Sequence, residues 1–230
     1  MQSNNDLTTV DLATVDHPAP TKHDLLRIFT DRSAVSTPLP KERSAAVAMV
    51  FHEDAGDLKL CIGRRATVVG DPWSGDRAFP GGKPDAQDAS LHDTASREAF
   101  EEVGLSLPAD SLIGDMGEMR FGVDSRTLFL YPLVYMIDAP TPFQLDHELV
   151  DAQWISAAAL WDRANWMLFN YGPSGQTYHG VDVMDHYLWG MSLRVLHDFS
   201  RRIERPLTPL YEGMDLPWRD GDVVASTRIG

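Results

Sequence analysis

The sequence predicts an α/β fold in which a mixed central sheet is covered by helices on both faces. Short apolar segments typical of strands are interleaved with helical segments, and they lack the regular strand–helix–strand alternation of an all-parallel sheet. The 230 residues, 43% of them hydrophobic and 23% charged, suffice for one domain with extensions. We therefore expect a loose N-terminal extension over residues 1–22, one domain over residues 23–205 and a C-terminal tail over residues 206–230.

Each element is assigned from its apolar spacing and from the turn residues that flank it. Strands are expected at residues 45–51, 58–62, 115–121, 128–137 and 152–155. Helices are expected at residues 23–30, 90–103, 157–163 and 183–202. The helix over residues 90–103 has the clearest signals, because apolar residues recur at every fourth position, Ser90 stands at the N-cap and Gly104 stands where a left-handed residue would end it.

Composition excludes several classes of function. The chain carries 34 Asp and Glu against 20 Lys and Arg, a formal charge of −14, which opposes general binding to nucleic acid or to an anionic membrane surface. The longest nearly apolar run, residues 127–137, is shorter than the ~20 residues that cross a bilayer as a helix. Cys61 is the single cysteine, which excludes an intramolecular disulfide, and the start shows no secretory signal. These features predict a cytoplasmic protein without a membrane partner.

Three glutamates, Glu98, Glu101 and Glu102, are three and four residues apart on the expected helix, so their carboxylates emerge on one face. Each like-charged pair costs roughly 0.2–0.5 kcal/mol on a solvated helix. A hard divalent cation would reverse the sign of that term, and oxygen-only ligands favour Mg²⁺ or Mn²⁺ over zinc. The alternative is an ordinary solvated acidic face on which Arg97 pairs with its neighbours. A Gly-Gly turn just before the helix favours the metal site, since a backbone carbonyl exposed in such a turn can complete it.

The turn and the helix together resemble the Nudix box, the signature of the Nudix hydrolases. The pattern is a glycine, five residues, a glutamate, seven residues, and then Arg-Glu-aliphatic-any-Glu-Glu-any-Gly-aliphatic. Its second half matches residues 97–105 at every constrained position, and Gly81-Gly82 stands at its start. The first half departs by one residue, because Ala89 occupies the position of the glutamate and the nearest acid is Asp88.

A wider resemblance points to the coenzyme A pyrophosphatase branch of these hydrolases, over roughly residues 24–203. It rests on residues 64–66, 70–75, 79–82 and 188–196. The branch motif includes a second arginine that residues 67–71 lack.

The resemblance implies an α/β/α sandwich with a catalytic loop–helix–loop. It also implies Mg²⁺- or Mn²⁺-dependent cleavage of the diphosphate of a nucleoside diphosphate linked to another group. Coenzyme A, cut to 3′,5′-ADP and 4′-phosphopantetheine, is the first substrate to consider. NADH, ADP-ribose, a nucleotide sugar or a nucleoside triphosphate is the alternative, as is a catalytically silent domain that binds a nucleotide. Homodimers are common in the family, so a homodimer is a further expectation.

Residue roles carry over from the matching positions of the motif. The metal ligands on this reading are Glu98, Glu101, Glu102 and the carbonyl of Gly81, while Gly82, Arg97 and Gly104 support the site structurally. One of Glu98 and Glu148 orients or deprotonates the attacking water; the alternative for Glu148 is a surface-loop acid. Four basic residues near the box are candidates for binding substrate phosphate, with surface solubility as the competing interpretation: Arg64, Arg65, Arg77 and Lys83.

Overall fold

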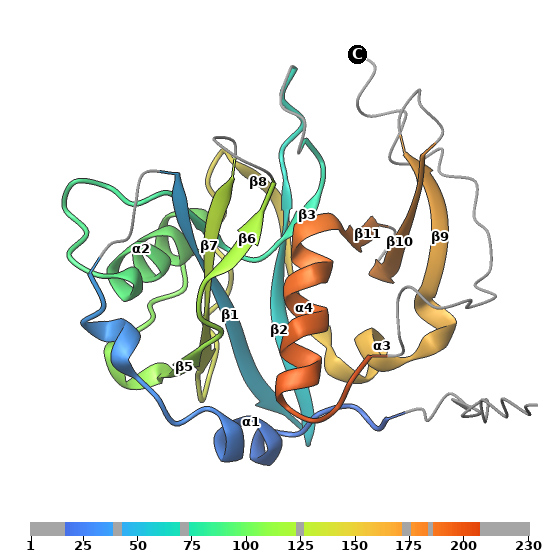
Figure 1. Cartoon of the computed structure of the whole chain (residues 1–230), viewed down its shortest axis with the longest axis horizontal. Coiled ribbons are helices and arrows are strands. Elements are labelled where there is room, and N and C mark those ends of the chain that lie inside the picture. Colours follow the sequence, from blue (N-terminus) through green and yellow to red (C-terminus); the bar gives the residue numbers. More distant parts are fainter. Residues whose placement is uncertain are drawn as a thin grey trace, which may run out of the picture.

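The computed structural model describes residues 17–38, 43–69, 74–122, 127–171, 176–183 and 186–207 (Figure 1). Its helices are α1 (Lys22–Ile28), α2 (Leu91–Val103), α3 (Ala157–Trp161) and α4 (Gly190–Arg202). Its strands are β1 (Ser44–Asp54), β2 (Asp57–Arg65), β3 (Arg77–Ala78), β4 (Gly81–Gly82), β5 (Leu112–Asp115), β6 (Met119–Phe121), β7 (Leu128–Met136), β8 (Leu149–Ser156), β9 (Trp166–Tyr171), β10 (Gln176–Val183) and β11 (His186–Trp189).

The main sheet of the described residues is mixed, as the sequence predicts. Strand β1 runs parallel to β7 over residues 44–51 and antiparallel to β2 on its other side. The order β3-β2-β1-β7-β5 is extended by β8 on β2, by β4 on β1 and by β6 on β7. Strands β9, β10 and β11 form a separate antiparallel sheet.

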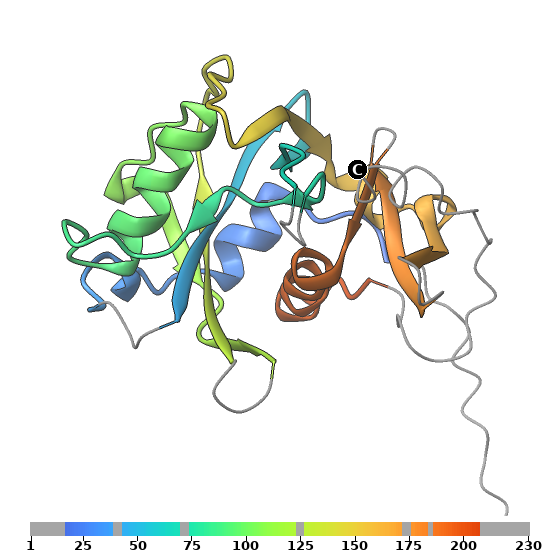
Figure 2. The ribbon, with the colours of Figure 1, turned by 90° about the horizontal axis from the view of Figure 1, so that it is seen from above.

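Two apolar layers cover the main sheet, because side chains alternate between its faces. On β1, Ala48 and Val50 pack with α2, whereas Met49 and Phe51 pack with α1 and α4. Figures 1 and 2 show α2 on one side of the sheet and α4 on the other. The apolar layer on the side of α1 and α4 includes Leu25 of α1 and residues just after α4. Both ends of the described chain therefore contribute to one core. The α/β sandwich is confirmed.

Helix α2 begins and ends as its sequence predicts. The Ser90 side chain accepts a hydrogen bond from the Asp93 backbone N–H, and Gly104 ends the helix in the left-handed conformation with φ +73°. A side chain at residue 104 would meet the Cβ of Gln144 at 2.8 Å, which is a second reason for glycine there.

The helix predicted over residues 183–202 is wrong in its first part. Residues 186–189 form strand β11, and the helix begins only at Gly190. Leu188 is fully buried on β11 opposite Val181, so its place in the apolar stripe reflects sheet packing instead of a helix face. Strands β9 and β10 were absent from the prediction.

Two smaller differences have local causes. The strand predicted over residues 115–121 is divided into β5 and β6, because Asp115 accepts a hydrogen bond from the N–H of Gly117, whose φ is +74°. The helix predicted over residues 157–163 ends at Trp161. Residues 1–16, 70–73 and 208–230, which include most of both predicted extensions, lie outside the described residues.

Candidate active site

The Gly81–Gly82 turn lies directly against helix α2. It forms β4, which pairs with Ala46 and Val47 of β1, and the N–H of Gly81 donates a 2.9 Å hydrogen bond to Oε2 of Glu102. Gly81 has φ +153°, and a Cβ there would lie 2.6 Å from the Cα of Val47. A Cβ on Gly82 would lie 2.5 Å from the Cδ of Glu98. Only glycines therefore allow the sheet, the turn and the two carboxylates to pack this closely.

Glu102 is a buried carboxyl group with only 4% of its surface exposed. Burial raises the pKa of Glu102 to about 8; the hydrogen bond from Gly81 opposes this shift, and the charges of Glu98 and Glu148 add to it. The pKa of Glu98 is also raised, first by burial and then by neighbouring carboxylates, against the opposing effect of Arg97. Ionisation of Glu98 and Glu102 therefore costs free energy in the folded chain, and a bound cation would offset that cost.

Glu148 comes from the segment before β8, far from α2 in the sequence, and its charge raises the pKa of both Glu98 and Glu102. Its carbonyl accepts a 2.7 Å hydrogen bond from the N–H of Ala66, which fixes the segment at the end of β2. Glu148 therefore lies within electrostatic reach of Glu98 and Glu102. Glu101 differs, because its carboxylate is half exposed and accepts a 2.8 Å hydrogen bond from Nη1 of Arg97.

Arg97 ties the loop after Gly82 to helix α2. Its Nε and Nη2 each donate a 3.0 Å hydrogen bond to Asp88, and Nη2 also donates to the carbonyl of Lys83. A third contact, 3.0 Å long, joins Nη2 to Oε1 of Glu98. Through these contacts, the single guanidinium of Arg97 positions both the loop and the carboxylate of Glu98.

Asp88 is a supporting residue to which the sequence assigned no role. Its side chain is 4% exposed and also accepts a 2.8 Å hydrogen bond from the N–H of Asp85. Although burial opposes the shift, hydrogen bonds from Arg97 and from the Asp85 backbone lower the pKa of Asp88. Its position one residue before the expected acid of the motif was the available signal.

The four candidate phosphate-binding residues occupy different surroundings. The charge of Arg65 lowers the pKa of Glu102, so Arg65 lies near the carboxylates. Lys83 is exposed. The side chain of Arg77 is 1% exposed and its Nη1 lies 3.1 Å from Oδ2 of Asp151, so the structure buries it in an ion pair. Arg64 and Arg65 are the last two residues of β2. Because successive side chains of a strand point to opposite faces of the sheet, Arg64 projects from the face opposite to that of Arg65.

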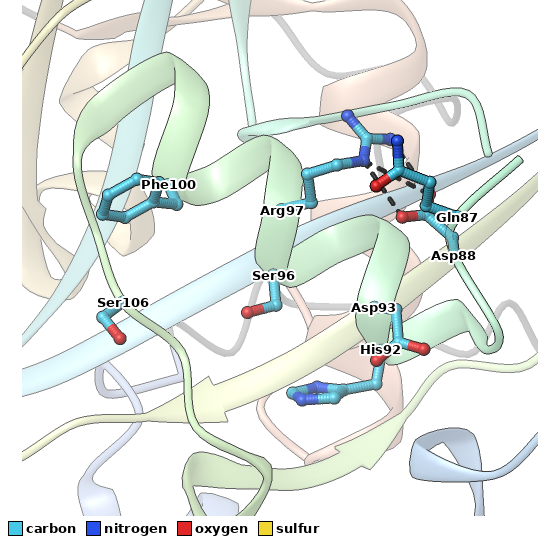
Figure 3. A pocket seen from close by; sticks show the side chains of 8 residues that line it. All are labelled: Gln87, Asp88, His92, Asp93, Ser96, Arg97, Phe100 and Ser106. Carbon is cyan, nitrogen blue, oxygen red and sulfur yellow. Dashed lines mark hydrogen bonds and ion pairs between the residues drawn. The ribbon is translucent and has the colours of Figure 1, made fainter. Parts of the chain in front are cut away.

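A hollow of about 400 Å³ lies along the outer surface of α2, on the side shown in Figure 3. Arg97 and Asp88 form one wall, and His92, Ser96 and Phe100 lie along the helix. Its lining does not include Glu98, Glu102 or Glu148, so this hollow is separate from the three carboxylates.

The carboxylates suit a divalent cation by their chemistry. Among the described residues, no three His, Cys, Asp or Glu side chains already stand close enough to form a ready metal site. The side chains that pack against the Gly81–Gly82 turn, Glu98 and Glu102, offer only oxygen donors, and their pKa values are raised by burial and by neighbouring carboxylates. Oxygen donors and excess negative charge fit Mg²⁺ or Mn²⁺.

Comparison with known proteins adds an independent finding. Residues 40–172 match the model of the NUDIX domain. An uncharacterized Nudix hydrolase, NudL, of Yersinia enterocolitica is 27% identical over 134 residues, which are 56% of this chain and 67% of the relative. The peroxisomal coenzyme A diphosphatase ndx-8 of Caenorhabditis elegans is 33% identical over 140 residues, 57% of this chain and 56% of the relative.

A chloroplast relative extends the similarity further along the chain. Nudix hydrolase 22 of Arabidopsis thaliana is 25% identical over 186 residues, 76% of this chain and 60% of the relative. The chain thus spans 56% to 67% of the length of these three curated relatives. In the part of the chain that the structure describes, no helix is long and apolar enough to cross a membrane.

Proposed function

Because this chain belongs to the NUDIX domain family, we propose that it is a Mg²⁺- or Mn²⁺-dependent hydrolase that cleaves the diphosphate of a nucleoside diphosphate linked to another group. The observation that supports the proposal is the close packing of the Glu98 and Glu102 carboxylates against the Gly81–Gly82 turn. A buried carboxyl group whose pKa is raised to about 8, in part by the charges of Glu98 and Glu148, is a feature that clusters at functional sites.

The residues divide into ligands, a base and supports. Glu98, Glu101, Glu102 and the carbonyl of Gly81 are the proposed metal ligands. A bound divalent ion would neutralise the phosphate oxygens and lower the pKa of an attacking water. Glu98 or Glu148 would then hold or accept the proton of that water. Burial raises the pKa of Glu98, in the direction that suits a base working near neutral pH.

Arg97 and the glycines act on geometry in this proposal. Arg97 fixes Glu98 and, through Asp88, the loop that leads into α2. Gly82 leaves the space that Glu98 occupies, and Gly104 ends the helix just after Glu102. Arg65, whose charge lowers the pKa of Glu102, is the first of the basic candidates to test for contact with the diphosphate, whereas Arg77 is engaged with Asp151.

We propose coenzyme A as the first substrate to test, in view of the motif resemblance and of the diphosphatase activity in the name of the Caenorhabditis relative. NADH, ADP-ribose, nucleotide sugars and nucleoside triphosphates are the other members of the panel. Mass spectrometry of products after incubation with Mg²⁺ decides among them. Absence of 4′-phosphopantetheine from the coenzyme A reaction would refute the coenzyme A assignment.

The metal assignment has its own test. We expect the double variant Glu101→Gln, Glu102→Gln to lose Mg²⁺-dependent hydrolysis while keeping its fold. The matched control, Glu53→Gln with Glu204→Gln, makes the same change of charge at exposed positions away from α2 and should keep its activity. Equal turnover in both double variants would contradict the proposal.

The proposed cytoplasmic location and homodimer need separate experiments. Cell fractionation tests the first, and light scattering of the purified chain tests the second. The proposed domain limits, residues 23–205, are tested by expressing that segment and measuring cooperative unfolding. Leu207 is buried in the core formed with α1 and α4, so the expressed segment should be extended by two residues, to residue 207.

A further inference from the structure

Residues 144–148 form the segment that leads into strand β8, and this segment lies against the C-terminus of helix α2. The N–H of Gln144 donates a 3.0 Å hydrogen bond to the carbonyl of Val103, and the N–H of Asp146 donates a 3.4 Å hydrogen bond to the carbonyl of Glu102. The last carbonyls of a helix lack partners within the helix, so the segment supplies partners for two of them. Its backbone is thereby fixed to Glu102, whose side chain is a proposed metal ligand.

Asp146 also holds Glu148 through its side chain. Oδ1 of Asp146 accepts a 2.7 Å hydrogen bond from the N–H of Glu148. This is the turn in which an Asp or Asn side chain bonds the backbone two residues further on. The other oxygen, Oδ2, lies 3.7 Å from Nδ1 of His147, whose side chain is 90% exposed. Because exposed ion pairs contribute little, the bond to Glu148 is the more important of the two contacts.

The backbone of Glu148 is bonded on both sides. Its N–H donates to Asp146, and its carbonyl accepts a 2.7 Å hydrogen bond from the N–H of Ala66 at the end of β2. Glu148 itself is exposed, so the place of its carboxylate depends on the backbone that carries it and not on core packing. Asp146 thus connects Glu148 to Glu102, with its side chain bonded to the first and its N–H bonded to the second.

The two candidate bases have different surroundings. Glu98 packs against the Gly81–Gly82 turn and contacts Nη2 of Arg97 at 3.0 Å, an arrangement that suits a fixed metal ligand. Glu148 is exposed and comes from a different segment, yet its charge acts on Glu98 and Glu102. A carboxylate beside the ligands and open to water suits a base that must meet an attacking water.

We infer that Asp146 is a positioning residue for Glu148, and that Glu148, held in this way, is the carboxylate that accepts the proton of the attacking water. The inference rests on the proposed function and decides between its two candidate bases. The water oxygen bonds to one phosphorus of the diphosphate. The bond from that phosphorus to its leaving oxygen breaks, and this oxygen keeps the bonding electron pair while Glu148 takes the water proton.

The first experiment measures steady-state hydrolysis with Mg²⁺, using coenzyme A or the panel compound that the wild-type chain cleaves fastest. Asp146→Ala removes the acceptor of the turn and should lower kcat about tenfold to hundredfold, with KM changed by less than about threefold. Asp146→Asn keeps an oxygen acceptor and should stay within about threefold of the wild-type kcat, because the turn needs an acceptor and not a charge. Glu148→Gln should lower kcat at least as much as Asp146→Ala.

A double-mutant cycle tests whether Asp146 acts through Glu148. In a chain that already carries Glu148→Gln, Asp146→Ala should cause no further loss of kcat. The matched control is Asp162→Ala, because Asp162 accepts a 2.9 Å hydrogen bond from the N–H of Ala164 in the same kind of turn, just after α3. This control should keep the wild-type kcat. Unchanged kcat in Asp146→Ala, equal losses in Asp146→Ala and Asp146→Asn, or additive losses in the cycle would overturn the inference.

The second experiment needs no substrate. Hydrogen exchange followed by NMR should show a protection factor of the Glu148 amide at least about tenfold lower in Asp146→Ala than in the wild-type chain, and near the wild-type value in Asp146→Asn. Equal protection in the wild-type chain and Asp146→Ala would overturn the inference.

Calorimetry with Mg²⁺ completes the design. Asp146→Ala should bind the ion within about threefold of the wild-type affinity, because the carboxylates of α2 stay in place. A much larger loss would show that Asp146 supports the metal ligands, which would also overturn the inference. If the wild-type chain cleaves no compound of the panel, the proposed function fails, while the exchange measurement still decides whether Asp146 holds Glu148.

Discussion

Replacing Glu102 by glutamine should stabilise the metal-free chain at pH 8 and change it little at pH 4. Folding raises the pKa of Glu102 from its ordinary value of 4.5 to about 8. Between these values the folded chain binds more protons than the unfolded chain, so stability falls as the pH rises. At about 1.4 kcal/mol per pKa unit, the loss between pH 5 and pH 8 amounts to about 3–4 kcal/mol. Glutamine stays neutral and can still accept the Gly81 hydrogen bond.

The assay is urea unfolding of both proteins in EDTA at several pH values. Four histidines have pKa values lowered by burial, and they contribute the opposite slope, because they lose stability as the pH falls: His52, His92, His179 and His197. Subtracting the variant curve from the wild-type curve cancels their contribution. A difference that stays constant from pH 5 to pH 8 would refute the reasoning.

Magnesium extends the same experiment. A ligand that binds only the folded chain stabilises it by RT ln(1 + [L]/Kd), about 2.7 kcal/mol at a hundredfold excess over Kd. We expect Mg²⁺ to restore stability to the wild-type chain at pH 8 and to do much less for Glu102→Gln. Equal stabilisation of both would place the ion elsewhere.

Three further predictions follow from contacts around α2. Gly82→Ala puts a methyl group 2.5 Å from Cδ of Glu98 and should lower kcat at least tenfold with little change in far-ultraviolet circular dichroism, and an unchanged kcat would contradict it. Arg97→Lys loses the paired contacts to Asp88 and should cost about 1–2 kcal/mol in urea unfolding while lowering Mg²⁺ affinity, whereas Arg194→Lys on α4 serves as the control. Gly104→Ala forces a side chain into a left-handed position and should lower the free energy of unfolding by about 1–2 kcal/mol; a stabilised variant would exclude the strain.

The sequence predicts elements well where their signals are local. Helix α2 has its cap residues within its own segment, and both ends agree with the structure. Strand β11 has no such signal, because Leu188 is buried through its pairing with Val181 of the neighbouring strand β10, at a spacing that also fits the apolar stripe of the helix that follows. The apolar spacing alone could not distinguish the two cases.

The candidate site shows the same division. Helical spacing places Glu98 near Glu101 and Glu102, but consecutive residues on a helix are rotated by about 100°, so Glu101 and Glu102 face different surroundings. Glu102 faces the sheet and Glu101 faces Arg97. The contact between Asp88 and Arg97 depends on the path of a loop, and the burial of Arg77 against Asp151 depends on strand register. Residue spacing in the sequence reveals neither.

The Gly81–Gly82 turn is hydrogen-bonded into the centre of the main sheet. It pairs with β1, and the carbonyl of Pro80 accepts a 2.7 Å hydrogen bond from the N–H of Ala48. Local opening of the turn would therefore require breaking bonds of a central strand, whose opening energies approach that of global unfolding. The carboxylates therefore pack against a turn whose conformation is already fixed. Any motion that admits substrate or releases product must come from other segments around the site.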